Sequence, residues 1–509
     1  MIDGRLLTEE LIVYANTFLD LDKRDNEYFR NLLLKEFNLL SPMSEVPDLS
    51  YVKKLDVPDV LTEKIESYAR ENNIVEEGLE NLFSTRIFGI LSPLPSKVNQ
   101  KFNELKDSQG ELKASEYFYN LSVMNNYVQK TAIGKNLMWK FDDGDKYLEI
   151  TINLSKPEKD NKEIAKLLSL PKTDVKYPAC FLCKENEGFQ GTVAHPSRVN
   201  IRTVSVNLAS EPWFIQYSPY AYFNEHLIAI NEKHIPMGIT EKTIDKVMDF
   251  VDYLPNYMIG SNASLPLIGG SILNHEHFQG GEHLMPMHNA KVKKEYFTKE
   301  FDKVKIGKVD WYNSVIRLES KNRSQINALS KRIVTAWENY TDEENFIFAN
   351  TDGVKHNSLS PVCRKKGDLY IMDIILRNNI TTSEYPEGVF HAHPEYHNIK
   401  KEGIGLIEAM GLFILPGRLK KQLYMIAEIL CGKEEYSNEL KDGGYLAVHK
   451  TMIEDLKKQF TPKDMIEAEK IVTDRVNQTC KNILFNTAVF KDTEVGNRGF
   501  DKFILKVLG

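Results

Sequence analysis

The 509-residue sequence has no uninterrupted apolar run of about 18 residues, and residues 1–20 are acidic and amphipathic rather than basic and then apolar. A membrane-spanning helix needs the first feature, and a secretion signal needs the second. The sequence therefore predicts a cytoplasmic protein with no membrane partner.

A surplus of positive charge is also missing, since Lys and Arg total 65 against 72 for Asp and Glu and the formal net charge is -7. Binding along a nucleic-acid backbone requires a basic surface, so nucleic acid is excluded as an expected partner. A local cationic pocket for one phosphate ester is still compatible with this charge. The composition, 42% hydrophobic and 27% charged, is near the globular average and predicts a folded protein of two to four domains.

Cysteine is scarce and odd in number, which excludes a disulfide framework. Cys180 and Cys183 form a single close pair, which in a reducing cytosol points to metal binding or redox chemistry. The other three, Cys363, Cys431 and Cys480, are predicted to be ordinary buried residues.

Four regions differ in pattern, and together they predict an α+β fold. Residues 1–170 are expected to be mainly helical, residues 171–310 and 311–430 to mix strands with helices, and residues 431–509 to form a helical tail. The two mixed regions could be diverged copies of one unit. Expected helices are 9–19, 26–39, 60–82, 114–128, 240–254, 324–339 and 403–410. Expected strands are 147–154, 199–208, 213–217, 226–231, 345–349 and 369–376, and the charged stretch 155–162 is expected to be a linker or cap.

The segment 274–281, Asn-His-Glu-His-Phe-Gln-Gly-Gly, carries most of the recognisable chemistry. Side chains of an extended chain alternate between two faces, so His275, His277 and Gln279 are expected on one face. The flanking glycines would let a substrate approach the backbone closely. Two imidazoles and one amide then line a single surface.

A metal site is predicted from the spacing of Cys180 and Cys183, which lets both thiolates reach one tetrahedral ion. His234, at the end of an expected strand, would supply a third ligand and His275 a fourth. This predicts a Cys2His2 zinc site that joins three separate segments. The alternative is a pair of unliganded cysteines beside a packed histidine.

With His275 on the metal, His277 is the imidazole left for catalysis. A neutral imidazole is a competent nucleophile near pH 7 because its unperturbed pKa is about 6.5. The amide of Gln279 can donate to phosphoryl oxygens but cannot protonate a leaving group, which suits the expulsion of a sugar phosphate. Since the sequence also has no P-loop and no aspartate cluster for magnesium, we predict group transfer through a histidine–phosphorus bond.

These residues resemble galactose-1-phosphate uridylyltransferase, in particular the longer class of that family found in bacteria. His275-Glu-His-Phe-Gln279 is similar to His-Pro-His-x-Gln, the motif of the shorter class of the family, with Glu276 in place of proline. The resemblance implies that His277 is the nucleophile and that Gln279 binds the transferred phosphoryl group. It implies zinc at Cys180, Cys183, His234 and His275. The likeness covers about residues 85–430 and is best over 177–200, 213–237, 269–281 and 390–411.

The resemblance also implies a fold and a reaction. The fold would be two histidine-triad-like halves, antiparallel sheets with helices, preceded by the mainly helical N-terminal region. The shorter class of the family works as a homodimer, so a homodimer is a possible assembly of this chain. The substrates would be UDP-glucose and galactose 1-phosphate, and the products glucose 1-phosphate and UDP-galactose, by a ping-pong route. Histidine-triad hydrolases carry a third histidine where this chain has Gln279, so the amide indicates the transferase branch.

A second metal site is implied by a His-x-His pair in the family. Phe390-His-Ala-His393 is similar, with His356 as a third ligand beside His391 and His393. Asn289 stands where the family has an acidic ligand, which departs from the pattern. The alternative is a polar, hydrogen-bonded strand end.

Five further side chains are candidates for substrate binding. Guanidinium groups match phosphate oxygens, and amides or an ammonium group can hold hydroxyls or a sugar phosphate. The alternatives are surface salt bridges for the arginines, turn geometry for the asparagines and a solvated helix start for the lysine. The candidates are Arg198, Arg202, Asn224, Asn262 and Lys401.

Two other functions stay open at this point. A dinucleoside polyphosphate phosphorylase would use the same chemistry at His277 with another nucleotide and acceptor. A noncatalytic, zinc-stapled binding module would keep its partner affinity after His277→Ala and would never form a covalent intermediate.

Overall fold

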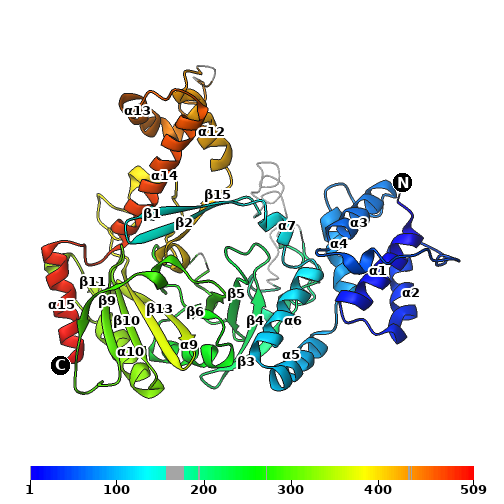
Figure 1. Ribbon diagram of the computed structural model, residues 1–509, viewed down its shortest axis with the longest axis horizontal. Helices are drawn as coiled ribbons and strands as arrows, with labels where there is room; N and C mark the ends of the chain where they lie inside the picture. Colours follow the sequence, from blue (N-terminus) through cyan, green and yellow to red (C-terminus); the bar gives the residue numbers. More distant parts are fainter. Residues whose placement is uncertain (1, 156–176, 193–194, 271, 434–435, 437) are drawn as a thin grey trace. The chain divides into compact units, whose positions relative to one another are not determined.

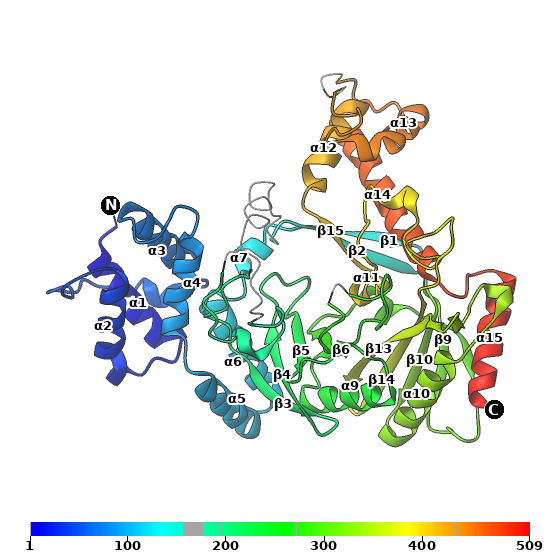
Figure 2. The same cartoon turned by 180° about the vertical axis from the view of Figure 1, so that it is seen from behind.

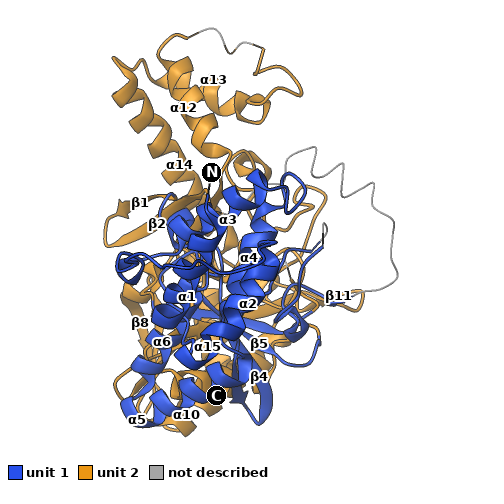
Figure 3. Ribbon diagram, turned by 90° about the vertical axis from the view of Figure 1, so that its right-hand side faces the viewer, with its two compact units in different colours: residues 1–135, 157–235, 275–282 blue, residues 136–156, 236–274, 283–509 orange. Residues whose placement is uncertain are grey.

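The computed structural model describes residues 2–155, 177–192, 195–270, 272–433, 436 and 438–509. Apart from Ser155, the expected linker 155–162 lies outside the described residues. The chain divides into two compact units (Figure 3). Unit 1 comprises residues 1–135, 157–235 and 275–282, and unit 2 comprises residues 136–156, 236–274 and 283–509. The division into four regions stays a prediction, since its first boundary, at residue 170, lies outside the described residues.

Unit 1 begins with a run of helices, which confirms the predicted helical start. Helices α1 to α4 pack against one another (Figure 1, blue). Their buried apolar faces include Leu11, Phe37, Phe83 and Phe88. The helices are α1 (Gly4–Phe18), α2 (Asn26–Glu36), α3 (Asp59–Glu71), α4 (Glu80–Leu91), α5 (Pro95–Gln109), α6 (Glu111–Met124) and α7 (Lys130–Ile133).

The single helix expected over residues 60–82 is wrong, because the chain turns between α3 and α4. Asn73 has a φ of 51°, a left-handed conformation that asparagine tolerates better than most residues. The backbone N–H of Ile74 donates to the carbonyl of Ala69 at 2.9 Å, which closes the end of α3. Apolar spacing continues through this turn, so the pattern did not reveal it.

Antiparallel strands follow in unit 1, in the order β3–β4–β5–β7. Helix α6 packs on them through Tyr217, whose ring lies 5.1 Å from that of Phe118 and whose hydroxyl donates to the carbonyl of Ser115. In the register of β5 and β7, Ile230 pairs with His277 and Ile228 with Gln279, which fixes both predicted catalytic positions. The strands are β3 (Val204–Leu208), β4 (Glu211–Tyr217), β5 (Leu227–Asn231) and β7 (His277–Gly281).

Unit 2 contains antiparallel strands in the order β6–β13–β14–β10–β9–β8. Helices α9 (Glu241–Tyr253) and α10 (Arg323–Glu338) lie against β13 (Figure 2). Helix α9 begins after Thr240, as predicted, and the backbone N–H of Thr240 donates to the hydroxyl of Thr243. The strands are β6 (Met258–Gly260), β13 (Asn357–Lys366), β14 (Leu369–Asn378), β10 (Val315–Ser320), β9 (Lys305–Val309) and β8 (Val292–Tyr296).

The rest of unit 2 is a small mixed sheet with helices. Strand β2 pairs antiparallel with β1 and parallel with β15. The expected strand 345–349 is wrong, since residues 343–345 form a single helical turn. The remaining elements are β1 (Leu137–Asp143), β2 (Lys146–Asn153), β11 (Asn350–Thr351), β12 (Val354–Lys355), α11 (Leu406–Ala409), β15 (Leu412–Pro416), α12 (Leu419–Leu430), α13 (Lys450–Gln459), α14 (Met465–Thr487) and α15 (Glu494–Leu508).

The predicted α+β class, with antiparallel sheets and a helical N-terminal region, is confirmed. Of the three cysteines expected to be buried, Cys363 and Cys480 are buried, whereas Cys431 is exposed just after α12. Within the described ranges, none of the helices combines the length and the apolar character that crossing a bilayer requires.

Candidate active site

The four predicted metal ligands lie together in unit 1. Their ligand atoms, the two cysteine Sγ atoms and one ring nitrogen of each histidine, all lie within 4.8 Å of one another. The Sγ atoms of Cys180 and Cys183 are 3.5 Å apart, and Nδ1 of His275 lies 3.3 and 3.7 Å from them. A zinc ion sits about 2.3 Å from sulfur and about 2.0 Å from nitrogen, so a tetrahedral site separates its ligand atoms by about 3.4 to 3.8 Å. The group therefore has the dimensions of a metal site.

The tautomer of His275 also fits a bound cation. Nε2 of His275 lies 2.8 Å from the carbonyl of Asn231, and a carbonyl can only accept, so the proton is on Nε2 and the lone pair of Nδ1 faces the sulfurs. Burial and the neighbouring Cys180 raise the pKa of the Cys183 thiol to about 12. A bound cation would reverse that shift, because it favours the thiolate.

Backbone and side-chain hydrogen bonds join the segment of His234 to the segment of His275. Asn231, the last residue of β5, donates from its backbone N–H to the carbonyl of Glu276 at 3.0 Å and from its side-chain amide to the Glu276 carboxylate at 2.7 Å. The backbone N–H of Glu276 donates to the carbonyl of Ile235 at 2.7 Å. Both histidine ligands are thus held between paired stretches of chain.

His277 begins β7 and is 6% exposed. Its Nδ1 lies 2.8 Å from the carbonyl of His275, so Nδ1 carries the proton and the lone pair of the ring is on Nε2. Burial lowers the pKa of His277, which keeps the ring neutral at pH 7. The ring therefore has the tautomer of an Nε2 nucleophile.

Gln279 follows two residues later, and strand alternation puts its side chain on the face of His277. Phe278 lies on the other face, where its ring stacks on Trp213 at 4.7 Å. Gly281 packs closely against the protein itself, since a Cβ there would lie 2.6 Å from the carbonyl of Glu225. The close approach at this glycine is therefore made by the loop before β5.

Comparison with known families identifies the chain. Residues 23–236 match the N-terminal domain of galactose-1-phosphate uridyl transferase, and residues 249–443 match the C-terminal domain. The chain belongs to the galactose-1-phosphate uridyl transferase family. The match confirms the predicted family, its nucleotidyltransferase class and its place in galactose metabolism.

Relatives in this uridyl transferase family match over almost the whole chain. A galactose-1-phosphate uridylyltransferase of Caldanaerobacter subterraneus subsp. tengcongensis is 44% identical over 99% of this chain and 98% of its own length. One of Fusobacterium nucleatum subsp. nucleatum is 40% identical over 100% and 97%. Among solved structures, yeast Ap4A phosphorylase Apa2 in complex with AMP covers 70% of this chain and 94% of its own, with 11% identity and a TM-score of 0.32. That likeness is too distant to add to the family assignment.

The structure places the predicted substrate residues of this uridyl transferase in different surroundings. In unit 1, the Arg198 guanidinium lies 5.7 Å from the ring of Tyr127, and the Asn224 amide donates to the Glu282 carboxylate at 3.2 Å. In unit 2, Asn262 is buried and accepts from the backbone N–H of Leu406, and Lys401 is exposed. Substrate binding by these four residues stays a prediction.

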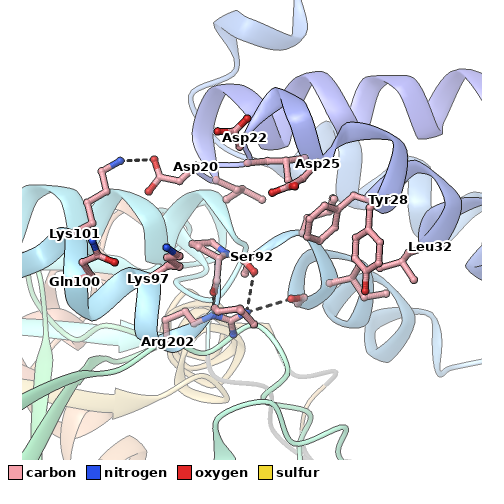
Figure 4. Close-up of a pocket in the computed structure, with 18 of the residues that line it drawn as sticks. Asp20, Asp22, Asp25, Tyr28, Leu32, Ser92, Lys97, Gln100, Lys101 and Arg202 are labelled. Carbon is pink, nitrogen blue, oxygen red and sulfur yellow. Dashed lines mark hydrogen bonds and ion pairs between the residues drawn. The ribbon is translucent and has the colours of Figure 1, made fainter.

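Arg202 is placed differently, because backbone carbonyls accept hydrogen bonds from all of its N–H donors. A guanidinium has five N–H donors, and five hydrogen bonds of 2.6 to 3.2 Å leave Arg202. It lines a cavity of about 920 Å3 in unit 1, where it reaches the loop of Ser92 (Figure 4). Saturated donors argue against the predicted contact with a substrate phosphate. The accepting carbonyls belong to Gly89, Ser92, Pro93, Val199 and Ile201.

The Arg202→Met variant is expected to lower the stability of unit 1 by about 3 kcal/mol or more, because several buried carbonyls lose their donor. The KM for the nucleotide sugar should stay within about twofold of the wild-type value. Thermal unfolding and steady-state kinetics well below the transition measure both effects. The matched variant is Arg198→Met, whose side chain makes fewer backbone contacts. A tenfold rise in KM at unchanged stability would instead show that Arg202 binds the substrate.

The second predicted metal set is not brought together. In the described part of the chain, His391 of unit 2 groups with Glu387 and His397, and neither His356 nor His393 belongs to this group. Nδ1 of His356 lies 3.0 Å from the Asn379 amide oxygen. His393 instead stacks on Tyr385 at 4.1 Å and points Nε2 to the carbonyl of Val389. His391 and His393 do not share a metal site, because their two rings point to different neighbours.

Two residues of this site were missed by sequence reasoning. Asn231 holds the ring of His275, and His226 lies 3.3 Å from the Gln279 amide oxygen through its Nε2. Both lie at the ends of β5, His226 just before it and Asn231 as its last residue. The signal that could have found them is polar residues at both ends of an otherwise apolar strand.

Proposed function

We propose that this chain transfers a uridylyl group between UDP-glucose and galactose 1-phosphate, with His277 as the nucleophile. The relatives that match nearly its full length are named for this activity. One observation carries the proposal for the residue. The hydrogen bond from Nδ1 of His277 to the carbonyl of His275 leaves the ring lone pair on Nε2, two residues from a group of side chains that can bind a metal.

The reaction takes two displacements at phosphorus. Nε2 of His277 attacks the α-phosphorus of UDP-glucose, the bond to the bridging oxygen breaks, and glucose 1-phosphate leaves with the electron pair. A phosphate oxygen of galactose 1-phosphate then attacks the uridylyl group, the nitrogen–phosphorus bond breaks, and UDP-galactose forms. Neither leaving group requires a proton, because a sugar phosphate is stable as an anion and imidazole is neutral.

Gln279 is proposed to donate from its side-chain amide to an oxygen of the transferred phosphoryl group. An amide donor stabilises the charge that collects on those oxygens in the transition state. It cannot deliver a proton to the leaving group, and the mechanism does not need one.

Zinc is proposed as the ion at Cys180, Cys183, His234 and His275, because two thiolates and two imidazoles in a tetrahedron suit Zn2+. Bound there, it would supply structural support and would fix the chain just before His277. The homodimer and the cytoplasmic location stay predictions.

The test is the intact mass of the protein after incubation with UDP-glucose alone. Without an acceptor the first displacement should stop at the intermediate, so we expect a gain of one uridylyl group that is labile in acid. Galactose 1-phosphate should then discharge the adduct and restore the starting mass.

An unshifted mass in folded, metal-loaded protein would contradict the proposal and favour the noncatalytic binding module. A parallel incubation with diadenosine tetraphosphate tests the phosphorylase alternative. That alternative requires an adenylyl adduct to form faster than the uridylyl adduct.

A further inference from the structure

His226 is a buried histidine for which the proposed mechanism has no use. It is 3% exposed, it precedes β5, and its ring lies 5.2 Å from that of Tyr222 and 4.6 Å from that of Phe223. Both of its ring nitrogens have a polar neighbour. The backbone N–H of Tyr222 points to Nδ1 at 3.5 Å, and the side-chain oxygen of Gln279 lies 3.3 Å from Nε2.

These two contacts have a defined direction. A backbone N–H can only donate, so Nδ1 of His226 is the acceptor and the proton of the neutral ring is on Nε2. Nε2–H can donate only to the oxygen of the Gln279 amide. The oxygen is thus occupied by His226, and the NH2 group of Gln279 is directed elsewhere.

We propose that His226 is a positioning residue that fixes which end of the Gln279 amide meets the transferred phosphoryl group. A glutamine amide has an accepting and a donating end of nearly equal size, and without a constraint either could face the substrate. An oxygen beside a phosphoryl oxygen would repel it, whereas the NH2 group stabilises it. This inference rests on the proposed function, since it requires that Gln279 contact the phosphoryl group.

The surroundings of His226 keep its proton on Nε2, and so keep the Gln279 amide in one orientation. Burial lowers its pKa to about 4, so the ring is neutral at the pH of the cytosol. A protonated ring would place a second N–H against that of Tyr222. The register of β5 and β7 pairs Ile228 with Gln279, and His226 directly precedes β5, so the pairing of the two strands keeps the two side chains close together.

The experiment measures single-turnover uridylylation by UDP-glucose, which separates substrate affinity from the rate constant. His226→Phe keeps an aromatic ring but has no donor, and it should lower the rate constant by about 10- to 100-fold. The Kd for UDP-glucose should change less than threefold, because the contact acts in the transition state. His226→Gln places an amide N–H near the same acceptor and should recover most of the rate.

A double-mutant cycle with Gln279→Ala identifies the route of the effect. If His226 acts through Gln279, His226→Phe should have almost no further effect once Gln279 is replaced. The chain offers a matched control in unit 2, where Nε2 of the buried His449 lies 3.1 Å from the Gln422 side-chain oxygen. His449→Phe breaks a bond of the same kind and should leave the rate constant unchanged.

The outcomes distinguish the two proposals. A wild-type protein that never takes up a uridylyl group contradicts the proposed function itself. If the wild type is labelled and His226→Phe is labelled equally fast, or if its effect is additive with that of Gln279→Ala, the positioning role is overturned. Should His226→Phe fail to fold, His226→Leu takes its place as the variant without a donor: a loss of tenfold or more that His226→Gln recovers supports the role, and an unchanged rate contradicts it.

Discussion

The His277→Asn variant is expected to lose uridylyl exchange by about 10,000-fold or more. Removing the nucleophile of a covalent mechanism leaves only substrate binding and charge stabilisation. In other enzymes these account for a small fraction of the catalysed rate. No uridylyl adduct should appear in the intact mass after incubation with UDP-glucose. The Kd for UDP-glucose should change little, since the substitution removes the attacking nitrogen without adding bulk.

Asparagine is chosen because of the hydrogen bond to the carbonyl of His275. Its amide N–H lies at about the position of Nδ1 and can keep that bond, while nothing replaces Nε2. Loss of activity then reports on the nucleophile and not on the strand. His449→Asn serves as the control for replacing a buried histidine, in the other unit. More than 1% of wild-type exchange in His277→Asn, with the wild-type substrate dependence, would exclude His277 as the nucleophile.

Some features of this fold and site could be predicted because they are encoded over short distances. The capped helix after Thr240 follows from local apolar spacing and one hydroxyl residue. The gap between Cys180 and Cys183 predicts that both sulfurs can reach one ion, and the structure brings the two Sγ atoms to 3.5 Å from each other. The partners His234 and His275 are distant in sequence, and their assignment to the same ion also depended on resemblance to a family.

Other features depend on contacts that no local pattern contains. The sequence shows that Arg202 is cationic, but whether its donors meet phosphate or carbonyl oxygens depends on residues 89–93, at the end of α4 and about a hundred residues away. A His-x-His pair offers two ligands only if both rings face the same point. His391 and His393 do not, because Tyr385 holds the ring of His393 by stacking.

The same reasoning explains why one helix was predicted over residues 60–82, where the structure has a turn between two helices. Apolar spacing reports which residues are buried, and it continues across a turn when the next helix is buried on the same side. The turn begins at a left-handed residue, Asn73, and Gly78 also has a positive φ before α4 begins. Asparagine favours such a conformation only weakly, so its identity alone was not decisive.

The second large effect is expected at the metal group, where Cys183→Ser should abolish stable metal binding. A serine hydroxyl is neither deprotonated nor soft enough to replace a thiolate. Structural zinc contributes on the order of 10 kcal/mol in small domains, so losing one ligand should cost several kcal/mol of stability in unit 1. Elemental analysis should fall from one zinc per chain to nearly none, and the unfolding temperature should fall with it.

The unfolding temperature in the presence of a chelator separates metal loss from damage to packing. A chelator should lower the unfolding temperature of the wild type toward that of Cys183→Ser and should leave Cys183→Ser itself unchanged, because a ligand stabilises only the state that binds it. Cys431→Ser is the matched control, since the Cys431 side chain is exposed in unit 2. This variant should keep both its bound zinc and its response to the chelator. Equal unfolding temperatures with and without the chelator in the wild type would mean that Cys180 and Cys183 are a packed pair without an ion. In that case the position of His277 would depend on the pairing of β5 with β7 and on the hydrogen bonds of Asn231 and Glu276, which join the same two segments without a metal.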